Sequence, residues 1–349
     1  MIEQVTEIVG PVYMVGGAVR DIILGKEPVD YDFATPLLPD EIEAKIREKG
    51  KRPFITGKRF GTIGVVIDKK LVEITTFRGE RYIEGSRKPI VEFVSDLSQD
   101  LARRDFTFNA LACRDDKIID PFNGQMDLKN KLIRAVGIPT HRFKDDPLRM
   151  LRACRFASQL GFDIEEKTLK SINKNNYKIL NVSKERWMQE LDKLLMGDHV
   201  KKGLTYLFET ELMKFMIPEL FIQYRFNQRT QFHQFDLHEH TMLVVQNAPK
   251  DINLKWAAML HDVAKPFIFQ DKGNRYIYPL HERLGEEFVE KISRYLHWGN
   301  DRRKVVKELV LNHLNDDSPL RKYDNTSKLN DKLLPESNIK DLNTDSISI

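Results

Sequence analysis

Three acidic residues in the first quarter of the chain have the types and spacing of a metal site. Asp30 and Asp32 flank Tyr31 in a predicted β-strand, so both carboxylates are expected on one face and the tyrosine on the other. Glu73 lies between apolar neighbours on a second predicted strand and could reach the same site, or could simply face solvent. Hard divalent cations prefer oxygen ligands, and two of them about 4 Å apart can activate an attacking hydroxyl and steady a leaving pyrophosphate. The spacing therefore predicts a magnesium site.

A pair of glycines precedes these carboxylates, between a predicted strand and a predicted helix. In the run VGGAVRD at residues 15–21, the backbone at Gly17 can approach a phosphate closely, and the N-terminus of the following helix favours an anion. Arg20, in the first turn of that helix, adds a positive charge. The alternative is a tight strand-to-helix turn without a ligand, so the glycines by themselves are a weak signal.

The elements that must position these residues are mixed strands and helices. Short β-branched segments separated by glycines and turns predict strands at residues 11–15, 29–34, 61–68 and 71–77, and a further pair within 110–120. Helices are predicted at residues 18–24 and 40–49. We therefore expect an α+β fold, in which a small mixed β-sheet with helices forms the first 140 residues.

The remainder of the chain has mainly helical periodicity. Apolar residues recur at helical spacing from about residue 143 to 196, which predicts a helical connector, and residues 203–314 are also mostly helical and contain seven of the nine histidines. After Pro319 the chain is polar, with too few apolar residues for a core. The expected domains are residues 1–140, a helical neck at 141–202, a helical domain at 203–318 and a disordered tail at 319–349.

Five motifs, in order, resemble those of the class II tRNA nucleotidyltransferases and bacterial poly(A) polymerases. The family's first motif is Gly-Gly-x-Val-Arg-Asp followed by Asp-x-Asp, as at residues 16–32. The other four are RRDFTFNA at 103–110 for ribose recognition, DPFNG at 120–124 for the hinge between head and neck, DDPLR at 145–149 for base reading, and SKER with the following Glu190-Leu191 for stabilising a helix. This order over residues 15–195 argues against a chance similarity.

The resemblance implies an enzyme that extends tRNA without a nucleic-acid template. The 3′-hydroxyl of tRNA would attack the α-phosphate of CTP or ATP and release pyrophosphate, with Mg2+ held by Asp30 and Asp32 and with Glu73 as a third catalytic carboxylate. The nucleotide-binding residues expected are Gly17, Arg20, Arg104, Asp105, Asn109, Asp146, Arg149, Arg152 and Arg155. The nearest alternative is a member of the same family that adds only A, to tRNA or as a poly(A) tail.

The base-reading motif also has a physical rationale. Asp146 and Arg149 are three residues apart at the start of a predicted helix, so they project side by side. An aspartate can accept from the amine that cytosine and adenine share, and an arginine can donate to the neighbouring ring acceptor. UTP and GTP would leave buried partners unpaired and be rejected. The alternatives are that Asp146 caps the helix that Pro147 opens, or that it pairs with Arg149 on the surface.

Neighbouring residues refine this hypothesis. At about 100° per residue, Arg152 and Arg155 turn progressively away from Asp146, so Arg155 could instead buttress the helix or touch phosphate from another direction. The family usually has Glu where this chain has Asp145, which would loosen base selection if that residue orients Arg149.

Residues 78–88 resemble the flexible loop of members that add the terminal A. Residues 57–62 resemble the tRNA enzymes more than the poly(A) polymerases, the alternative being a glycine-bounded turn.

A second motif lies in the histidine-rich half. LHDVAK at residues 260–265 resembles the HD metal-dependent phosphohydrolases, and His240 stands where their upstream histidine would. A second divalent metal is therefore expected at His240, His261 and Asp262, and a purely structural His-Asp pair is the alternative. A full HD site needs a distal Asp, for which only Asp316 and Asp317 are near. A truncated or inactive module, or a phosphohydrolase whose head only binds RNA, stays open.

Composition sets weaker limits. Lys and Arg number 56 against 52 Asp and Glu, and the net charge of +4 does not by itself indicate nucleic acid. Only Cys113 and Cys154 are present, no apolar signal precedes the first motif, and no run approaches the roughly 18 apolar residues that span a bilayer. A cytoplasmic protein without a membrane partner is expected, and the sequence leaves the oligomeric state open.

Overall fold

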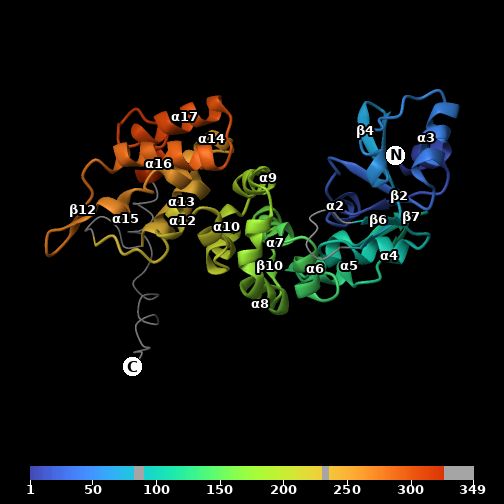
Figure 1. Ribbon diagram of the computed structural model, residues 1–349, viewed down its shortest axis with the longest axis horizontal. Coiled ribbons are helices and arrows are strands. Elements are labelled where there is room, and N and C mark those ends of the chain that lie inside the picture. Colours follow the sequence, from blue (N-terminus) through green and yellow to red (C-terminus); the bar gives the residue numbers. More distant parts are fainter. Residues whose placement is uncertain (82–89, 230–235, 326–349) are drawn as a thin grey trace. The chain divides into compact units, whose positions relative to one another are not determined.

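The computed structural model describes residues 1–81, 90–229 and 236–325, which divide into two compact units. The head unit contains Met1–Ala153 and Phe162–Lys178, and the helical unit contains Cys154–Gly161 and the described residues from Ile179 onward. The division falls within helix α7 (Leu148–Leu160), which is labelled in Figure 1. Residues of the expected neck are therefore distributed over both units.

A six-stranded mixed sheet forms the centre of the head unit. Its strand order is β3-β4-β2-β1-β7-β8, in which only β2 and β4 pair in parallel. The strands are β1 (Tyr13–Val15), β2 (Tyr31–Thr35), β3 (Thr62–Ile67), β4 (Lys70–Thr76), β7 (Ala112–Arg114) and β8 (Lys117–Ile119). The six predicted strands are confirmed, and so is the α+β class.

Helices of the head unit cover the sheet through apolar side chains at helical spacing. They include α1 (Ile2–Val9), α2 (Gly17–Ile23) and α3 (Pro39–Glu48), and Val5, Ile42 and Ile46 are buried. α3 begins with Pro39, whose fixed φ suits the first turn, and the Glu41 side chain accepts the Leu38 N–H at 2.8 Å. The two helices predicted here are confirmed to within one or two residues.

The rest of the head unit supplies the segments around the expected motifs. β5 (Arg78–Arg81) and β6 (Ile90–Phe93) pair antiparallel on the two sides of residues 82–89, which lie outside the described part and include residues 82–88 of the expected flexible loop. The other elements are α4 (Leu97–Ala102), α5 (Gly124–Lys129), β9 (Leu132–Ile133), α6 (Pro139–Asp145), β10 (Asp163–Ile164) and α8 (Glu166–Asn175). Sequence periodicity did not predict β5, β6, β9 or β10, because they are too short to alternate clearly.

The helical unit is built around buried aromatic residues such as Trp187, Phe208 and Trp256. Its elements are α9 (Lys184–Leu195), α10 (Val200–Glu209), α11 (Leu212–Met216), α12 (Pro218–Phe221), α13 (Leu237–Asn247), α14 (Ile252–Leu260), α15 (Lys265–Ile268), the small hairpin β11 (Gln270–Asp271) with β12 (Tyr276–Ile277), α16 (His281–Tyr295) and α17 (Asn300–Leu311). This confirms a helical second half. No helix of the described ranges has the length and apolar character needed to cross a membrane.

The chain beyond α17 takes part in this unit. Leu320 is 1% exposed and Asp324 is 2% exposed, so the polar segment expected to be a tail packs into the core as far as Asp324. Residues 326–349 of the expected tail lie outside the described part.

Candidate active site and candidate metal centre

Three carboxylates lie close together on the neighbouring strands β2 and β4 and just before β2. The parallel register places Asp32 directly beside Glu73, so their side chains lie on the same face of the sheet. Asp30 comes just before β2, and all three side chains are solvent-exposed. Desolvation by surrounding atoms raises the pKa of Asp32, the nearby Arg104 guanidinium opposes this, and the negative charges of Glu73 and Asp30 add to it. Exposed oxygens at this spacing, with a guanidinium close by, can attract both a cation and an anion.

Arg104 also explains one of the glycines. Gly16, the N-cap of α2, has a φ of +70°, and a Cβ at this position would lie 2.7 Å from Nη1 of Arg104. A larger residue would therefore be strained and would displace the guanidinium. At Gly17 a Cβ would make only ordinary contacts of 3.5 Å with Arg20. The first glycine thus makes room for a side chain of the same site, which sequence reasoning did not foresee.

A continuous hydrogen-bonded path connects α2 with α7. Arg20 Nη1 donates to Asn109 Oδ1 at 2.9 Å, and Asn109 Nδ2 donates to Asp105 Oδ1 at 3.1 Å. The other oxygen of Asp105 accepts from Arg152 Nε at 2.7 Å. Burial opposes ionisation of Asp105, but Arg152 and Asn109 outweigh it and hold its pKa well below the usual range. Asp105 therefore fixes the orientation of two expected nucleotide-binding side chains.

Of the expected base-reading residues, Asp146 lies between α6 and α7, and Arg149 lies in the first turn of α7. Asp146 Oδ1 accepts the Leu148 N–H at 3.1 Å, which is the helix-capping role that the sequence left open. Arg149 is buried, and its Nη2 donates to the Arg103 carbonyl at 2.7 Å. Asp145, considered as an orienter of Arg149, forms an ion pair with Arg142 at 3.1 Å. Base recognition by Asp146 and Arg149 stays a prediction.

Arg155 belongs to the helical unit and faces different partners. Its Nε lies 2.8 Å from Glu190 Oε2, and both side chains are buried. Its guanidinium also lies over the Phe156 ring, 3.9 Å from the centroid. Glu190 belongs to the motif expected to stabilise a helix. These contacts therefore fit the alternative in which Arg155 supports helix α7.

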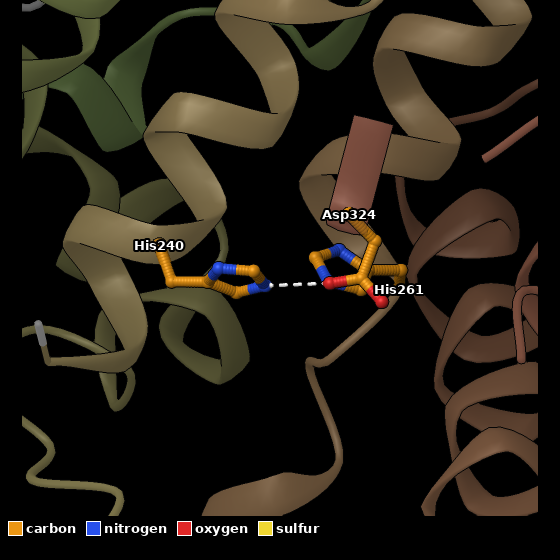
Figure 2. A group of neighbouring side chains, drawn as sticks. All are labelled: His240, His261 and Asp324. Carbon is orange, nitrogen blue, oxygen red and sulfur yellow. Dashed lines mark ion pairs between the residues drawn. The ribbon is translucent and has the colours of Figure 1, made fainter. Parts of the chain in front are cut away.

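Histidines and aspartates converge in the core of the helical unit. His240 on α13, His261 just after α14 and Asp324 beyond α17 are all buried and point toward one another (Figure 2). His240 Nε2 lies 3.1 Å from Asp324 Oδ1. The distal carboxylate is thus Asp324, and the expectation that only Asp316 or Asp317 could supply it was wrong. The only sequence signal for Asp324 was weak, namely the apolar Leu320 four positions earlier in a polar segment.

A second group, made of Asp262, His281 and His313, adjoins the first through the contact between Asp262 and His261. Asp262 Oδ2 lies 3.1 Å from His261 Nε2, whereas Asp262 Oδ1 lies 3.2 Å from His281 Nε2 and 3.6 Å from His313 Nε2. Lys265 Nζ donates to Asp262 Oδ2 at 2.6 Å. The two oxygens of one carboxylate therefore face two sets of possible ligands, and His313 had no motif to identify it.

Backbone carbonyls fix the orientation of three of these rings. The Nδ1 atoms of His261, His281 and His313 lie 2.8, 2.9 and 2.6 Å from the carbonyl oxygens of residues 258, 278 and 310. Because a carbonyl only accepts, each Nδ1 carries a proton and each Nε2 is turned into the cluster. This is the arrangement that orients histidines for metal binding.

The charge states and unpaired atoms also fit a divalent metal. Burial lowers the pKa of His240 to about 4, so the ring is neutral near pH 7. Burial opposes ionisation of Asp262, but the cationic forms of His261 and Lys265 outweigh it and hold its pKa well below the usual range. Among the described residues, His261 Nε2 and Asp262 Oδ1 are buried without a hydrogen-bond partner. Neutral His240 and ionised Asp262 are donors of the kind that divalent transition metals bind, and a metal would replace the proton that, against the effect of burial, Asp262 and Asp324 favour on His261 by raising its pKa.

Three family models match successive parts of the chain. They are the Poly A polymerase head domain at residues 12–134, the Probable RNA and SrmB-binding site of polymerase A at residues 161–222, and the HD domain at residues 237–337. The chain is therefore similar to the class of proteins that have a poly A polymerase head, here followed by an HD domain.

Within this class, the chain is similar to proteins described as CCA-adding enzymes. It is 44% identical over 205 residues to that of Pediococcus pentosaceus, 45% over 206 residues to that of Lactiplantibacillus plantarum and 41% over 218 residues to that of Staphylococcus aureus. These segments cover 58%, 58% and 62% of this chain and 51%, 50% and 54% of the respective relatives. The chain thus spans about half the length of these relatives.

Solved structures extend the similarity over more of the chain. The Bacillus stearothermophilus CCA-adding enzyme in complex with CTP matches with a TM-score of 0.63 and 27% identity, covering 93% of this chain and 79% of that one. A tRNA nucleotidyltransferase complexed with a primer tRNA and an incoming ATP analog matches with a TM-score of 0.59 and 23% identity, covering 96% and 100%. The second likeness shows the fold alone.

Proposed function

We propose that this chain is a template-independent CCA-adding tRNA nucleotidyltransferase, which transfers CMP and AMP from CTP and ATP to the tRNA 3′ end and releases pyrophosphate. The observation that carries the proposal is the pairing of Asp32 with Glu73 beside Asp30 and Arg104, within a head similar to those of CCA-adding enzymes. Exposed carboxylates beside a fixed guanidinium suit a triphosphate that arrives with a divalent cation.

In this proposal, different residues of the head bind Mg2+ and the triphosphate. Asp30, Asp32 and Glu73 hold Mg2+, which would activate the attacking hydroxyl and stabilise the leaving pyrophosphate. Arg104 and Arg20 bind the triphosphate as it approaches the backbone at Gly17, which is supported by the position of Arg104 beside Asp32 and of Arg20 beside Gly17.

The ribose and base are assigned to the segments that follow. Asp105 and Asn109 border the ribose and hold Arg20 and Arg152 in place through their hydrogen bonds. Asp146 and Arg149 are proposed to select the base. Arg155 is assigned to the support of α7 through Glu190, which departs from the expectation that it binds the nucleotide.

The test is incorporation of each of four labelled nucleotides into tRNA ending before, within and after the CC. Addition of C, C and A that then stops, with UTP and GTP rejected, is the expected result. Incorporation of A alone would replace the proposal with an A-adding or poly(A) polymerase of the same family. No incorporation with any nucleotide would contradict both.

A second activity is favoured by one specific observation, the position of Asp324. Asp324 lies with His240 and His261, and Asp262 lies with His281 and His313, so the helical unit has two adjoining groups of residues that could hold divalent metal. We propose that it is a metal-dependent phosphohydrolase, in which a bound metal would lower the pKa of a water that attacks a phosphate ester. Lys265 sits against Asp262 and would add a positive charge for the phosphate.

This second proposal is tested with p-nitrophenyl phosphate and bis(p-nitrophenyl) phosphate in the presence of Mg2+, Mn2+ or Ni2+. Release of p-nitrophenol that is lost in Asp324→Ala and retained in Asp32→Ala is expected. Absence of hydrolysis with every metal, or hydrolysis that persists in Asp324→Ala, would contradict it.

A further inference from the structure

One buried carboxylate in the head unit, Asp100 on α4, has no part in the roles assigned so far. It is 1% exposed and accepts hydrogen bonds from two consecutive arginines. Its Oδ1 accepts from Arg103 Nε at 3.0 Å and Nη2 at 2.8 Å, and its Oδ2 accepts from Arg104 Nη2 at 3.2 Å. Burial opposes ionisation, but Arg104 and Arg103 outweigh it and lower the pKa of Asp100, so the carboxylate is charged at neutral pH.

Each of the two arginines leads to a different part of the candidate active site. The Arg104 guanidinium lies beside Asp32 and fills the space that a side chain at Gly16 would need. The backbone carbonyl of Arg103 accepts a hydrogen bond from Arg149 at 2.7 Å. Asp100 therefore contacts two arginines, one beside the proposed phosphate-binding residues and one beside the proposed base-reading residue Arg149.

A third contact reaches the hairpin that leads into residues 82–89. Asp100 Oδ1 accepts the backbone N–H of Arg78, the first residue of β5, at 3.3 Å. The Arg78 side chain turns away and donates to the Phe60 carbonyl at 2.6 Å. Asp100 thus binds the backbone of β5 and also holds the side chains of the two arginines that follow α4.

We propose that Asp100 is a positioning residue that holds Arg104 ready for the triphosphate of the incoming nucleotide. The inference rests on the proposed nucleotidyltransferase function and deepens it. A long arginine side chain loses rotational freedom when it binds a phosphate, and a buried carboxylate that fixes it beforehand removes most of that cost. Asp100 acts through Arg104 and touches no substrate itself.

The test is a double-mutant cycle made from Asp100→Asn, Arg104→Ala and the double variant. Asparagine keeps the size of the side chain but removes its charge and one of its acceptors. A hydrogen bond to a charged group is worth about 1.5–3 kcal/mol, so Asp100→Asn is expected to raise the KM and the Kd for CTP and ATP by about tenfold or more. In the Arg104→Ala background the same change should raise them less than about twofold. Asp100→Glu tests whether charge alone restores affinity.

The matched control is Asp127→Asn in the same head unit. Asp127 is a buried aspartate (4% exposed) that also binds an arginine, Arg134, at 3.0 Å, and it accepts from Thr107 at 2.6 Å. Its loss should lower the melting temperature and combine additively with Arg104→Ala. Additive effects of Asp100→Asn and Arg104→Ala, or loss of stability with an unchanged nucleotide Kd, would overturn the positioning role.

Nucleotide binding is measured calorimetrically as well as through KM, because this separates two kinds of failure. If the wild-type protein binds CTP and ATP but adds neither to tRNA, the proposed function fails while the cycle still measures coupling between Asp100 and Arg104. If addition is normal and the cycle is additive, only the inference about Asp100 fails.

Discussion

The head and the helical unit both concentrate aspartates with basic partners, but the partners differ. In the head, Asp100 and Asp105 are bound by arginines, which stay protonated and cannot coordinate a metal. In the helical unit, Asp262 lies among histidines whose Nε2 atoms can lose or accept a proton. The first arrangement therefore suits an anion, and the second suits a metal ion.

Exposure separates the two regions further. Asp30, Asp32 and Glu73 are exposed at the surface of the sheet, whereas Asp262 and Asp324 are 1% and 2% exposed. Buried carboxylates among neutral imidazoles are costly unless paired or bound to metal. Under the two proposed functions, we expect a metal in the head to arrive with its nucleotide and a metal in the helical unit to be retained by the protein.

The strongest way to break the comparison is a reciprocal pair of substitutions. Asp32→Ala should reduce nucleotide addition at least about a thousandfold, because metal-ion stabilisation of charge in the transition state is worth several kcal/mol. It should leave hydrolysis of p-nitrophenyl phosphate unchanged, and His261→Ala should have the opposite effects. Initial rates of both reactions on the same preparations make the measurement. Loss of both activities in either variant would show that the two regions do not work separately.

A comparison within helix α7 sharpens the assignment of the arginines. Arg155→Met leaves Glu190 buried without its charge partner and should cost about 3–5 kcal/mol of unfolding free energy, with little change in the KM for CTP. In Arg152→Met, Asp105 loses Arg152 but still accepts a hydrogen bond from Asn109. This substitution should therefore mainly raise the KM for CTP. Chemical denaturation and steady-state kinetics distinguish the two. A raised KM at unchanged stability in Arg155→Met would return this residue to the nucleotide site.

The role of the segment beyond α17 can be tested through metal affinity. Asp324→Ala should weaken Mn2+ binding to the helical unit at least about a hundredfold, because it removes a direct ligand, which should matter at least as much as an outer-shell partner. Asp317→Ala, an exposed aspartate of the same segment, is the control and should bind Mn2+ as the wild type does. Calorimetric titration is done in the Asp32→Ala background to remove Mn2+ binding by the head. Equal affinities in the two variants would exclude Asp324 as a ligand.

The smallest expected effect concerns pH and the arginine-bound carboxylates of the head. The pKa of Asp100 is lowered in the folded state, so its contribution to stability is present above the unfolded pKa of about 3.9 and is lost as the pH falls through the folded value. The difference in unfolding free energy between wild type and Asp100→Asn should therefore be constant from pH 7 to 5 and shrink below pH 4. A difference that grew on acidification would contradict the charged pair.

Local patterns predicted the parts of the fold that depend on neighbours in sequence. The alternation of β-branched residues identified β2 and β4, and their pairing brought Asp32 and Glu73 together as expected. Capping signals placed α3. Periodicity missed the two-residue strands β9 and β10, whose length is too short for alternation to show.

Positions that depend on packing between distant segments were not predictable in the same way. His313 and Asp324 have no motif, and they reach the cluster because α13 packs on α14, α14 on α17 and α17 on α16. The partner of Arg155 also depends on packing, since α7 and α9 are joined by more than twenty residues.

The sequence by itself determined the class of the head, the carboxylates on its strands and the HD motif, because each is written in residues close together along the chain. The tertiary structure alone decided that Asp100 stands behind Arg104, that Asp105 joins Arg20 to Arg152 through Asn109, and that Asp324 completes the histidine cluster. The physical reason is that a buried charge takes its partner from whatever element packs against it, and that choice is made by the core rather than by the neighbours in sequence.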